Sequence, residues 1–221
     1  QALHDTTDAA VLAAKAITAY TCPTRRACAP FYWQGSPPSY AFHNDYAANS
    51  GSNSAFSWYI GPPSLAQADT IFNEAEVDPT SDPNHQFFKM QGANGVCHQR
   101  SVVALRDITD GTSNTYLVGE KLVRPEWYAS PDMTANYSNL DCGDDQCATS
   151  GDCFDLVRWT DRLPRCDTPG YLDVASFGSA HANGLNMAFC DGSVQQVSYT
   201  IEATVHQYLG SRNDNVPING K

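Results

Sequence analysis

The chain has 221 residues, of which 42% are hydrophobic and 17% charged, so it can form a core and lacks the composition of a disordered protein. Its formal net charge is −11, and no run rich in Lys or Arg occurs. Nucleic acid and anionic membranes are therefore excluded as expected partners, because both attract cationic surfaces. An acidic surface suits calcium better than it suits these anionic partners. We expect one domain over residues 1–221.

Few regular elements are predicted in the first half of the chain. The Ala-rich stretch Asp8–Tyr20 should begin as a short helix, become β-prone and stop before Pro23. Residues 30–63 are aromatic and rich in Pro and Ser, which indicates ordered loops with short strands. Ser64 is placed to cap a short helix that reaches Phe72.

The middle of the chain predicts two strands and a long irregular segment. Val102–Leu105 and Thr115–Glu120 are short β-type runs, and turn-forming residues lie between them. Residues 124–170 are rich in Pro, Gly, Asp and Cys. We expect this segment to be a surface insertion held by disulfides.

The clearest prediction is a hairpin near the C-terminus. Apolar residues alternate in Gly184–Cys190 and in Ser193–Ile201, and Asp191-Gly192 between them is a strong turn signal. The apolar phase changes after the turn, which indicates a bulge beside it. A short helix should follow near Glu202–Leu209. These elements predict an α+β fold, with an antiparallel sheet, long disulfide-braced loops and few short helices.

The cysteine count is even, which favours up to four disulfides formed in an oxidising compartment. The chain would then be exported to the cell surface or the extracellular space. A zinc site is the alternative, but only Cys142 and Cys147 approach zinc-ligand spacing. The eight cysteines are Cys22, Cys28, Cys97, Cys142, Cys147, Cys153, Cys166 and Cys190.

Two motifs resemble those of a bacterial family. His181 is followed by nine residues and then by Asp191-Gly192, which resembles the H-x(9)-D-G signature of prepilin-type proteins of largely unknown function. The segment Arg106–Glu120 is similar to the second hallmark of that family. Weaker similarities occur in the family's order, and they are Thr21–Thr24, Asp45–Ala47, Asp155–Trp159 and Leu209–Asp214.

The resemblance implies a pilin-like or pseudopilin-like head whose sheet packs on a long, hydrophobic N-terminal helix. The chain opens at Gln1 in what corresponds to the family's globular region, so we expect it to lack that helix. A membrane would be reached only through the helix. The implied role is a structural subunit of a filament or cell surface, which assembles with copies of itself or with related pilin-like subunits.

The second hallmark contains candidate calcium ligands. Asp107, Asp110 and Asn114 offer hard oxygen atoms, and the resemblance to pseudopilins, a class with calcium sites, adds weight to this interpretation. The favoured interpretation is nevertheless a hydrogen-bonded turn that includes Gly111, since Asp and Asn commonly stabilise turns, and the calcium loop is the alternative. Glu120 is a further ligand, or the ion-pair partner of Arg106 or Lys121.

The hairpin residues favour structural roles. We expect His181 to be packed or hydrogen-bonded rather than a ligand or base. Asp191 should accept hydrogen bonds within the turn, while Gly192 takes a positive φ.

A second acidic group is interpreted as a solvated loop, with irregular calcium binding as the alternative. Calcium is the cofactor that these two acidic groups would bind. The candidate ligands in this group are Asp141, Asp144 and Asp145, with Asp152 and Asp155 nearby.

Exposed aromatic side chains leave a second function open. Phe31, Tyr32, Trp33, Tyr40, Trp58 and Tyr59 lie in loop-like sequence. They favour a small second core, and the alternative is a calcium-dependent extracellular module that stacks on glycans. We expect no enzymatic activity, because the chain has no His-Glu-x-x-His, no Gly-x-Ser-x-Gly and no phosphate-binding glycine loop.

Overall fold

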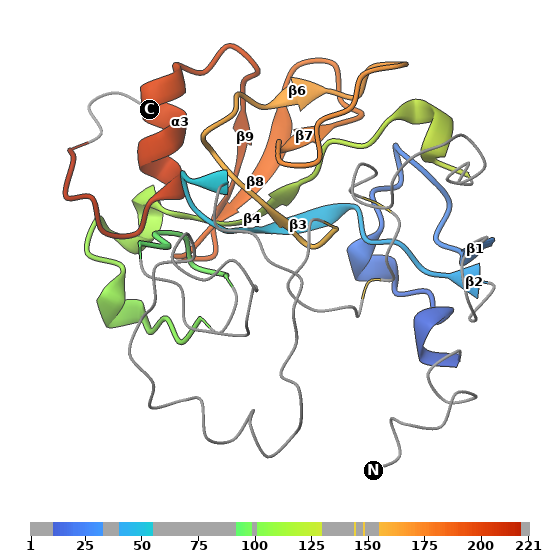
Figure 1. Ribbon diagram of the computed structural model, residues 1–221, viewed down its shortest axis with the longest axis horizontal. Coiled ribbons are helices and arrows are strands. Elements are labelled where there is room, and N and C mark those ends of the chain that lie inside the picture. The colour runs from blue at the N-terminus through green and yellow to red at the C-terminus, as the bar shows by residue number, and fades with distance from the viewer. Residues whose placement is uncertain are drawn as a thin grey trace, which may run out of the picture.

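The computed structural model describes residues 11–32, 40–54, 92–98, 101–129, 144, 148 and 155–217. A five-stranded sheet in the order β5-β3-β4-β8-β9 forms its centre (Figure 1). The strands are β3 (Tyr46–Asn49), β4 (Tyr116–Glu120), β5 (Val157–Arg158), β8 (Leu185–Phe189) and β9 (Val194–Val197). Strand β5 runs parallel to β3, whereas the other neighbours are antiparallel, so the sheet is mixed rather than wholly antiparallel.

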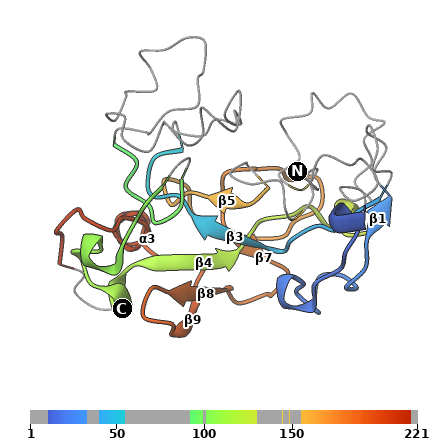
Figure 2. The same cartoon turned by 90° about the horizontal axis from the view of Figure 1, so that it is seen from below.

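The remaining elements are short, and the predicted α+β class is confirmed. Helix α3 (Ala203–Gly210) and the pair β1 (Phe31–Tyr32) and β2 (Tyr40–Ala41) lie at opposite ends of the long axis (Figures 1 and 2). Strand β6 (Arg165–Cys166) pairs in parallel with β7 (Gly178–Ser179). The 3-10 turns are η2 (Thr18–Tyr20), η6 (Leu105–Asp107), η7 (Thr112–Asn114) and η8 (Pro125–Trp127). Within the described ranges, every helix is too short or too polar to traverse a lipid bilayer.

The hairpin of β8 and β9 forms as its sequence predicts. In β8, Leu185, Met187 and Phe189 are buried while the residues between them are more exposed, which is the period-2 pattern of a strand with one core face. The amide of Phe189 donates to the carbonyl of Ser193, and the amide of Gly192 donates to the carbonyl of Phe189. The loop is therefore three residues long, and Gly192, with φ +86°, provides the predicted bulge.

One face of the sheet holds the main core. Its buried members come from β3, β4, β8, β9, α3 and the residue before β7, and they are Ala47, Tyr116, Phe177, Leu185, Met187, Phe189, Val197 and Leu209. The buried Asn49 side chain ties α3 to the sheet, since its amide donates to the carbonyls of Tyr116 and Gly210. Because α3 covers this face, the opposite face of the sheet is left for other contacts.

Three sequence predictions differ from the structure. Val102–Leu105 is not a strand: Val102 and Leu105 are exposed, since the apolar run finds no pairing strand and Leu105 enters η6. Residues 11–13 are helical as predicted, but the β-prone end of that segment forms η2 instead. The segment Ser64–Phe72 lies outside the described residues.

The interpretation of residues 124–170 as a surface insertion is also wrong in part. Val157 lies in β5 at the edge of the central sheet, and both Val157 and Trp159 are buried. Trp127, at the end of η8, is buried against Val123. Parts of this segment therefore complete the core, although its Asp- and Gly-rich sequence indicates loops.

The disulfide prediction is not borne out among the described residues. No two of their cysteines are joined, and Cys22, Cys28, Cys166 and Cys190 are free thiols. Each sulfur lies in a different environment: that of Cys22 is 3.8 Å from His181 Nε2, and that of Cys190 is 3.6 Å from a backbone carbonyl oxygen. A disulfide requires two sulfurs about 2 Å apart, which these separate positions do not allow. Cys142, Cys147 and Cys153 lie outside the described ranges.

Candidate functional site

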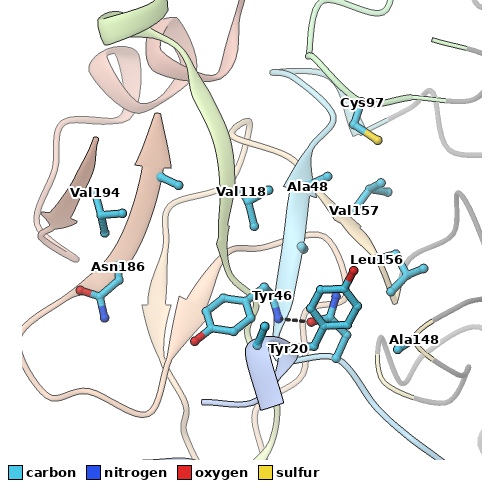
Figure 3. A pocket seen from close by; sticks show the side chains of 14 residues that line it. Tyr20, Tyr46, Ala48, Cys97, Val118, Ala148, Leu156, Val157, Asn186 and Val194 are labelled. Carbon is cyan, nitrogen blue, oxygen red and sulfur yellow. Dashed lines mark hydrogen bonds between the residues drawn. The ribbon is translucent and has the colours of Figure 1, made fainter. Parts of the chain in front are cut away.

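An apolar groove of about 810 Å³ crosses the face of the sheet that α3 does not cover (Figure 3). Period-2 alternation creates it, because the side chains between the core positions of β3 and β8 point to this face. The groove is lined by Ala19, Tyr20, Asn44, Tyr46, Ala47, Ala48, Cys97, Val118, Ala148, Leu156, Val157, Asn186, Ala188 and Val194. It therefore spans the sheet from β5 to β9.

The described part of the groove lining is uncharged. Among the described residues that line it, none is Asp, Glu, Lys or Arg, although the whole chain carries a net charge of −11. Its floor is made of small side chains, Ala48, Val118 and Ala188, and larger groups such as Tyr46 and Leu156 stand beside them (Figure 3). A floor of small residues allows the backbone of a partner to approach closely, and an uncharged lining favours an apolar partner.

The β9 edge of the groove is accessible to solvent. Val194 is 67% exposed and pairs with the half-buried Ala188 of β8, and Asn186 on the same strand is exposed. An apolar side chain exposed next to a hollow of this size forms part of a larger apolar surface, which is typical of an interaction site.

The predicted calcium ligands of the second hallmark make hydrogen bonds within the protein. Asp107 accepts a hydrogen bond from the amide of Ala104, and the two carboxylate oxygens of Asp110 accept bonds from the amides of residues 214–215. The side-chain amide of Asn114 donates to the carbonyl of Asp110. These contacts form a hydrogen-bonded turn, and they link the second hallmark to the C-terminal segment.

Gly111 also serves this turn. Its φ is +97°, and it precedes η7. A side chain at this position would be strained in a left-handed backbone, so the glycine belongs to the turn geometry.

The structure brings Glu120 and His181 together, one from each hallmark motif. Glu120 Oε1 lies 3.1 Å from His181 Nε2, and Glu120 Oε2 accepts a hydrogen bond from the amide of Asn186. The predicted partners of Glu120 are wrong, because Arg106 pairs with Asp107 and Lys121 with Asp144. Cys22 is the third member of this group.

The interpretation of Asp144 as part of a solvated acidic loop is wrong. Asp144 is fully buried and pairs with Arg26 and Lys121 at 2.6 and 2.8 Å. Burial alone would raise its pKa, but these two positive charges outweigh burial and hold the pKa of Asp144 well below its usual range. Asp141 and Asp145 lie outside the described residues, and Asp155 is buried.

The weaker motifs supply internal contacts. Asp45 accepts a hydrogen bond from the amide of Cys22 and pairs with Arg25. The Arg158 side chain donates to the carbonyl of Ser176. Arg212 donates to two carbonyls in the segment 92–98. These residues connect segments that are distant in sequence.

The aromatic loop residues are described only in part. Phe31 packs near Arg26 and His43, which fits a small second core, while Tyr40 is exposed. Trp33, Trp58 and Tyr59 lie outside the described ranges. The described residues therefore give no specific support to the glycan-binding alternative.

Sequence reasoning missed two features. The meeting of Cys22, Glu120 and His181 has no local signal, because up to 159 positions separate its members. The groove has a weak local signal in the sequence, because Ala188 is an apolar residue at an outward position of β8.

Comparison with known proteins gives one family. The family model described as "Protein of unknown function (DUF1559)" matches residues 1–204. No curated protein matches the chain, and no solved structure does. Since the match spans most of the 221 residues, the chain belongs to the bacterial family of proteins of unknown function DUF1559.

Proposed function

We propose that this protein is an extracellular or cell-surface structural subunit of pilin or pseudopilin type, and that its groove receives an apolar α-helix. The observation that carries the proposal is the uncharged groove on the open face of the central sheet. In a pilin-type subunit a long hydrophobic helix packs on the sheet of the head, and the H-x(9)-D-G resemblance of the sequence points to the same class.

Two properties of the groove support a helix as its occupant. Small residues form its floor, so a helix is able to lie close to the strands, as small residues allow in helix packing elsewhere. The groove also crosses several neighbouring strands, which suits a long element better than a compact ligand. A charged or strongly polar segment would lose hydration there without gaining a partner for its charges.

The test compares two valine substitutions in the cells that produce the protein. Val194→Glu places a charge at the edge of the groove, whereas Val102→Glu makes the same change at a residue that does not line it. Both side chains are mostly exposed, 67% and 72%, so both variants should fold. Electron microscopy with immunogold labelling should show wild type and Val102→Glu in regular filaments or pilus-like assemblies.

Val194→Glu should be depleted from those assemblies, because a buried unpaired carboxylate opposes docking of the helix. Circular dichroism and melting curves verify that both variants are folded. Equal incorporation of the two variants would refute the groove as the docking site. A wild-type protein found only as discrete monomers would refute the structural-subunit function itself.

A further inference from the structure

We propose that Cys22, Glu120 and His181 form a binding site for Zn²⁺, with one coordination position open to solvent or to a further ligand. The sulfur of Cys22, one ring nitrogen of His181 and a carboxylate oxygen of Glu120 all lie within 4.8 Å of one another. This is the one group of three or more such side chains found in the part of the chain that the structure describes.

The separations fit a common metal ion. Zn²⁺ binds sulfur at roughly 2.3 Å and nitrogen or oxygen at roughly 2.0–2.2 Å, so two ligands of a tetrahedral ion lie roughly 3.3–3.7 Å apart. The distance from Cys22 Sγ to His181 Nε2 is 3.8 Å, and from His181 Nε2 to Glu120 Oε1 it is 3.1 Å. Small rotations of the side chains therefore suffice to place one ion between the three atoms.

Burial is also consistent with a metal site. Cys22 and Glu120 are almost fully buried, whereas the His181 side chain is 30% exposed. Glu120 Oε1 faces His181 Nε2 at 3.1 Å, and the other carboxylate oxygen accepts a hydrogen bond from the amide of Asn186. A buried carboxylate is costly unless its charge is paired, and a cation between Oε1 and His181 would pair with it.

The geometry favours a metal over a catalytic cysteine. In a nucleophilic dyad with an orienting acid, the two ring nitrogens of histidine serve different partners. Here the same nitrogen, Nε2, faces both Cys22 and Glu120.

The donor set indicates zinc rather than calcium. Sulfur, imidazole nitrogen and carboxylate oxygen together are ligands that Zn²⁺ accepts, while Ca²⁺ prefers oxygen alone. The backbone around these side chains is also well fixed. The amide of Cys22 donates to Asp45, and the amide of His181 donates to Ser179 Oγ. The inference is independent of the proposed function, because none of the three proposed ligands lines the groove.

Cobalt substitution tests the site directly. The purified, reduced protein is treated with a chelator, dialysed and titrated with Co²⁺, and the thiolate-to-cobalt charge-transfer band is recorded. Zn²⁺ should bleach that band by competition and raise the melting temperature of the protein, whereas Mg²⁺ should not. We expect Cys22→Ser to lose the band and His181→Ala to weaken binding by more than about tenfold, since even residues that only hydrogen-bond to a metal ligand contribute that much.

Cys28→Ser is the matched control, because Cys28 is an exposed free thiol outside the cluster. This variant should retain the band and the affinity of the wild type. Circular dichroism of Cys22→Ser and His181→Ala should remain that of the wild type, and His181, being partly exposed, tolerates truncation without a large cavity. Wild-type affinity in both variants, or the absence of a charge-transfer band in the wild type, would overturn the zinc site.

Discussion

His206 is an ionisable side chain in an apolar core. It is fully buried, and its ring lies beside those of Tyr116 and Phe177, with centroids 5.5 and 6.4 Å away. Neither ring nitrogen has a hydrogen-bond partner among the described residues. Burial therefore lowers the pKa of His206 to about 4, so the imidazole is neutral in the folded protein near pH 7.

This pKa predicts a loss of stability in mild acid. The unfolded chain binds a proton at this histidine below pH ~6.5, whereas the folded protein resists protonation until pH is near its folded pKa. The contribution of His206 is thus complete above pH ~6.5 and declines by about 3 kcal/mol as the pH falls toward 4. His206→Phe should remove this pH-dependent loss of stability. Urea unfolding of both proteins at pH 7, 5.5 and 4.5 measures the difference.

Some pH dependence of stability should remain in the His206→Phe variant, because a second buried histidine also titrates at lowered pH. Burial also lowers the pKa of His43, so the variant should show a shallower pH dependence rather than none. Parallel stability curves for wild type and His206→Phe would show that His206 does not resist protonation in the fold.

At the scale of single elements, the hairpin of β8 and β9 depends on its turn. Asp191 Oδ1 accepts hydrogen bonds from the amide and hydroxyl of Ser193, at 2.9 and 2.7 Å. Gly192 has φ +86°, and a Cβ built on it would meet no atom within 4 Å. The demand for glycine is therefore one of backbone conformation and not of space.

Substitutions at Gly192 should follow this backbone preference. Gly192→Ala should lower the free energy of unfolding by roughly 1–2 kcal/mol, and Gly192→Val by more, because β-branched residues are poorly tolerated at positive φ. Gly192→Asn is the matched control and should cost less, since Asn is enriched in the left-handed region. Equal losses for Asn and Val, measured by urea unfolding, would contradict the conformational explanation.

At the scale of the whole molecule, buried ion pairs connect segments far apart in sequence. Three cations, Arg25, Arg26 and Lys121, meet three carboxylates, Asp45, Asp144 and Asp167, at distances of 2.6–3.2 Å. All six side chains are nearly inaccessible to solvent, and their formal charges balance. The interior is thus neutral here, although the whole chain carries a net charge of −11.

Removing one carboxylate should strongly destabilise this arrangement. Asp144→Asn removes the buried carboxylate that Lys121 and Arg26 share and leaves Arg26 only Asp45, so we expect a loss of roughly 3–5 kcal/mol in the free energy of unfolding. The control is Arg106→Gln, which breaks the exposed pair with Asp107 and should change stability by less than about 0.5 kcal/mol. Chemical denaturation at pH 7 compares the two, and a similarly small loss for both would show that the buried cluster is not needed.

The sequence alone determined the local elements of this protein. The hairpin of residues 185–197, its turn at Asp191-Gly192 and the short helix α3 were predictable, because period-2 alternation and turn chemistry act between neighbouring residues. The same reasoning indicated the turn formed by Asp110, although not its contact with residues 214–215.

Only the tertiary structure decided which distant residues meet and which faces stay open. Val102–Leu105 carries a strand-like pattern, but a strand also needs a partner, and this run has none. The sequence around Asp144 predicts a solvated loop, whereas in the folded protein Asp144 pairs with Arg26 and Lys121. The groove and the cluster at Glu120 likewise arise from chain segments that only the packed sheet brings together. They could not be predicted, because side-chain contacts over such separations leave no periodic signal in the sequence.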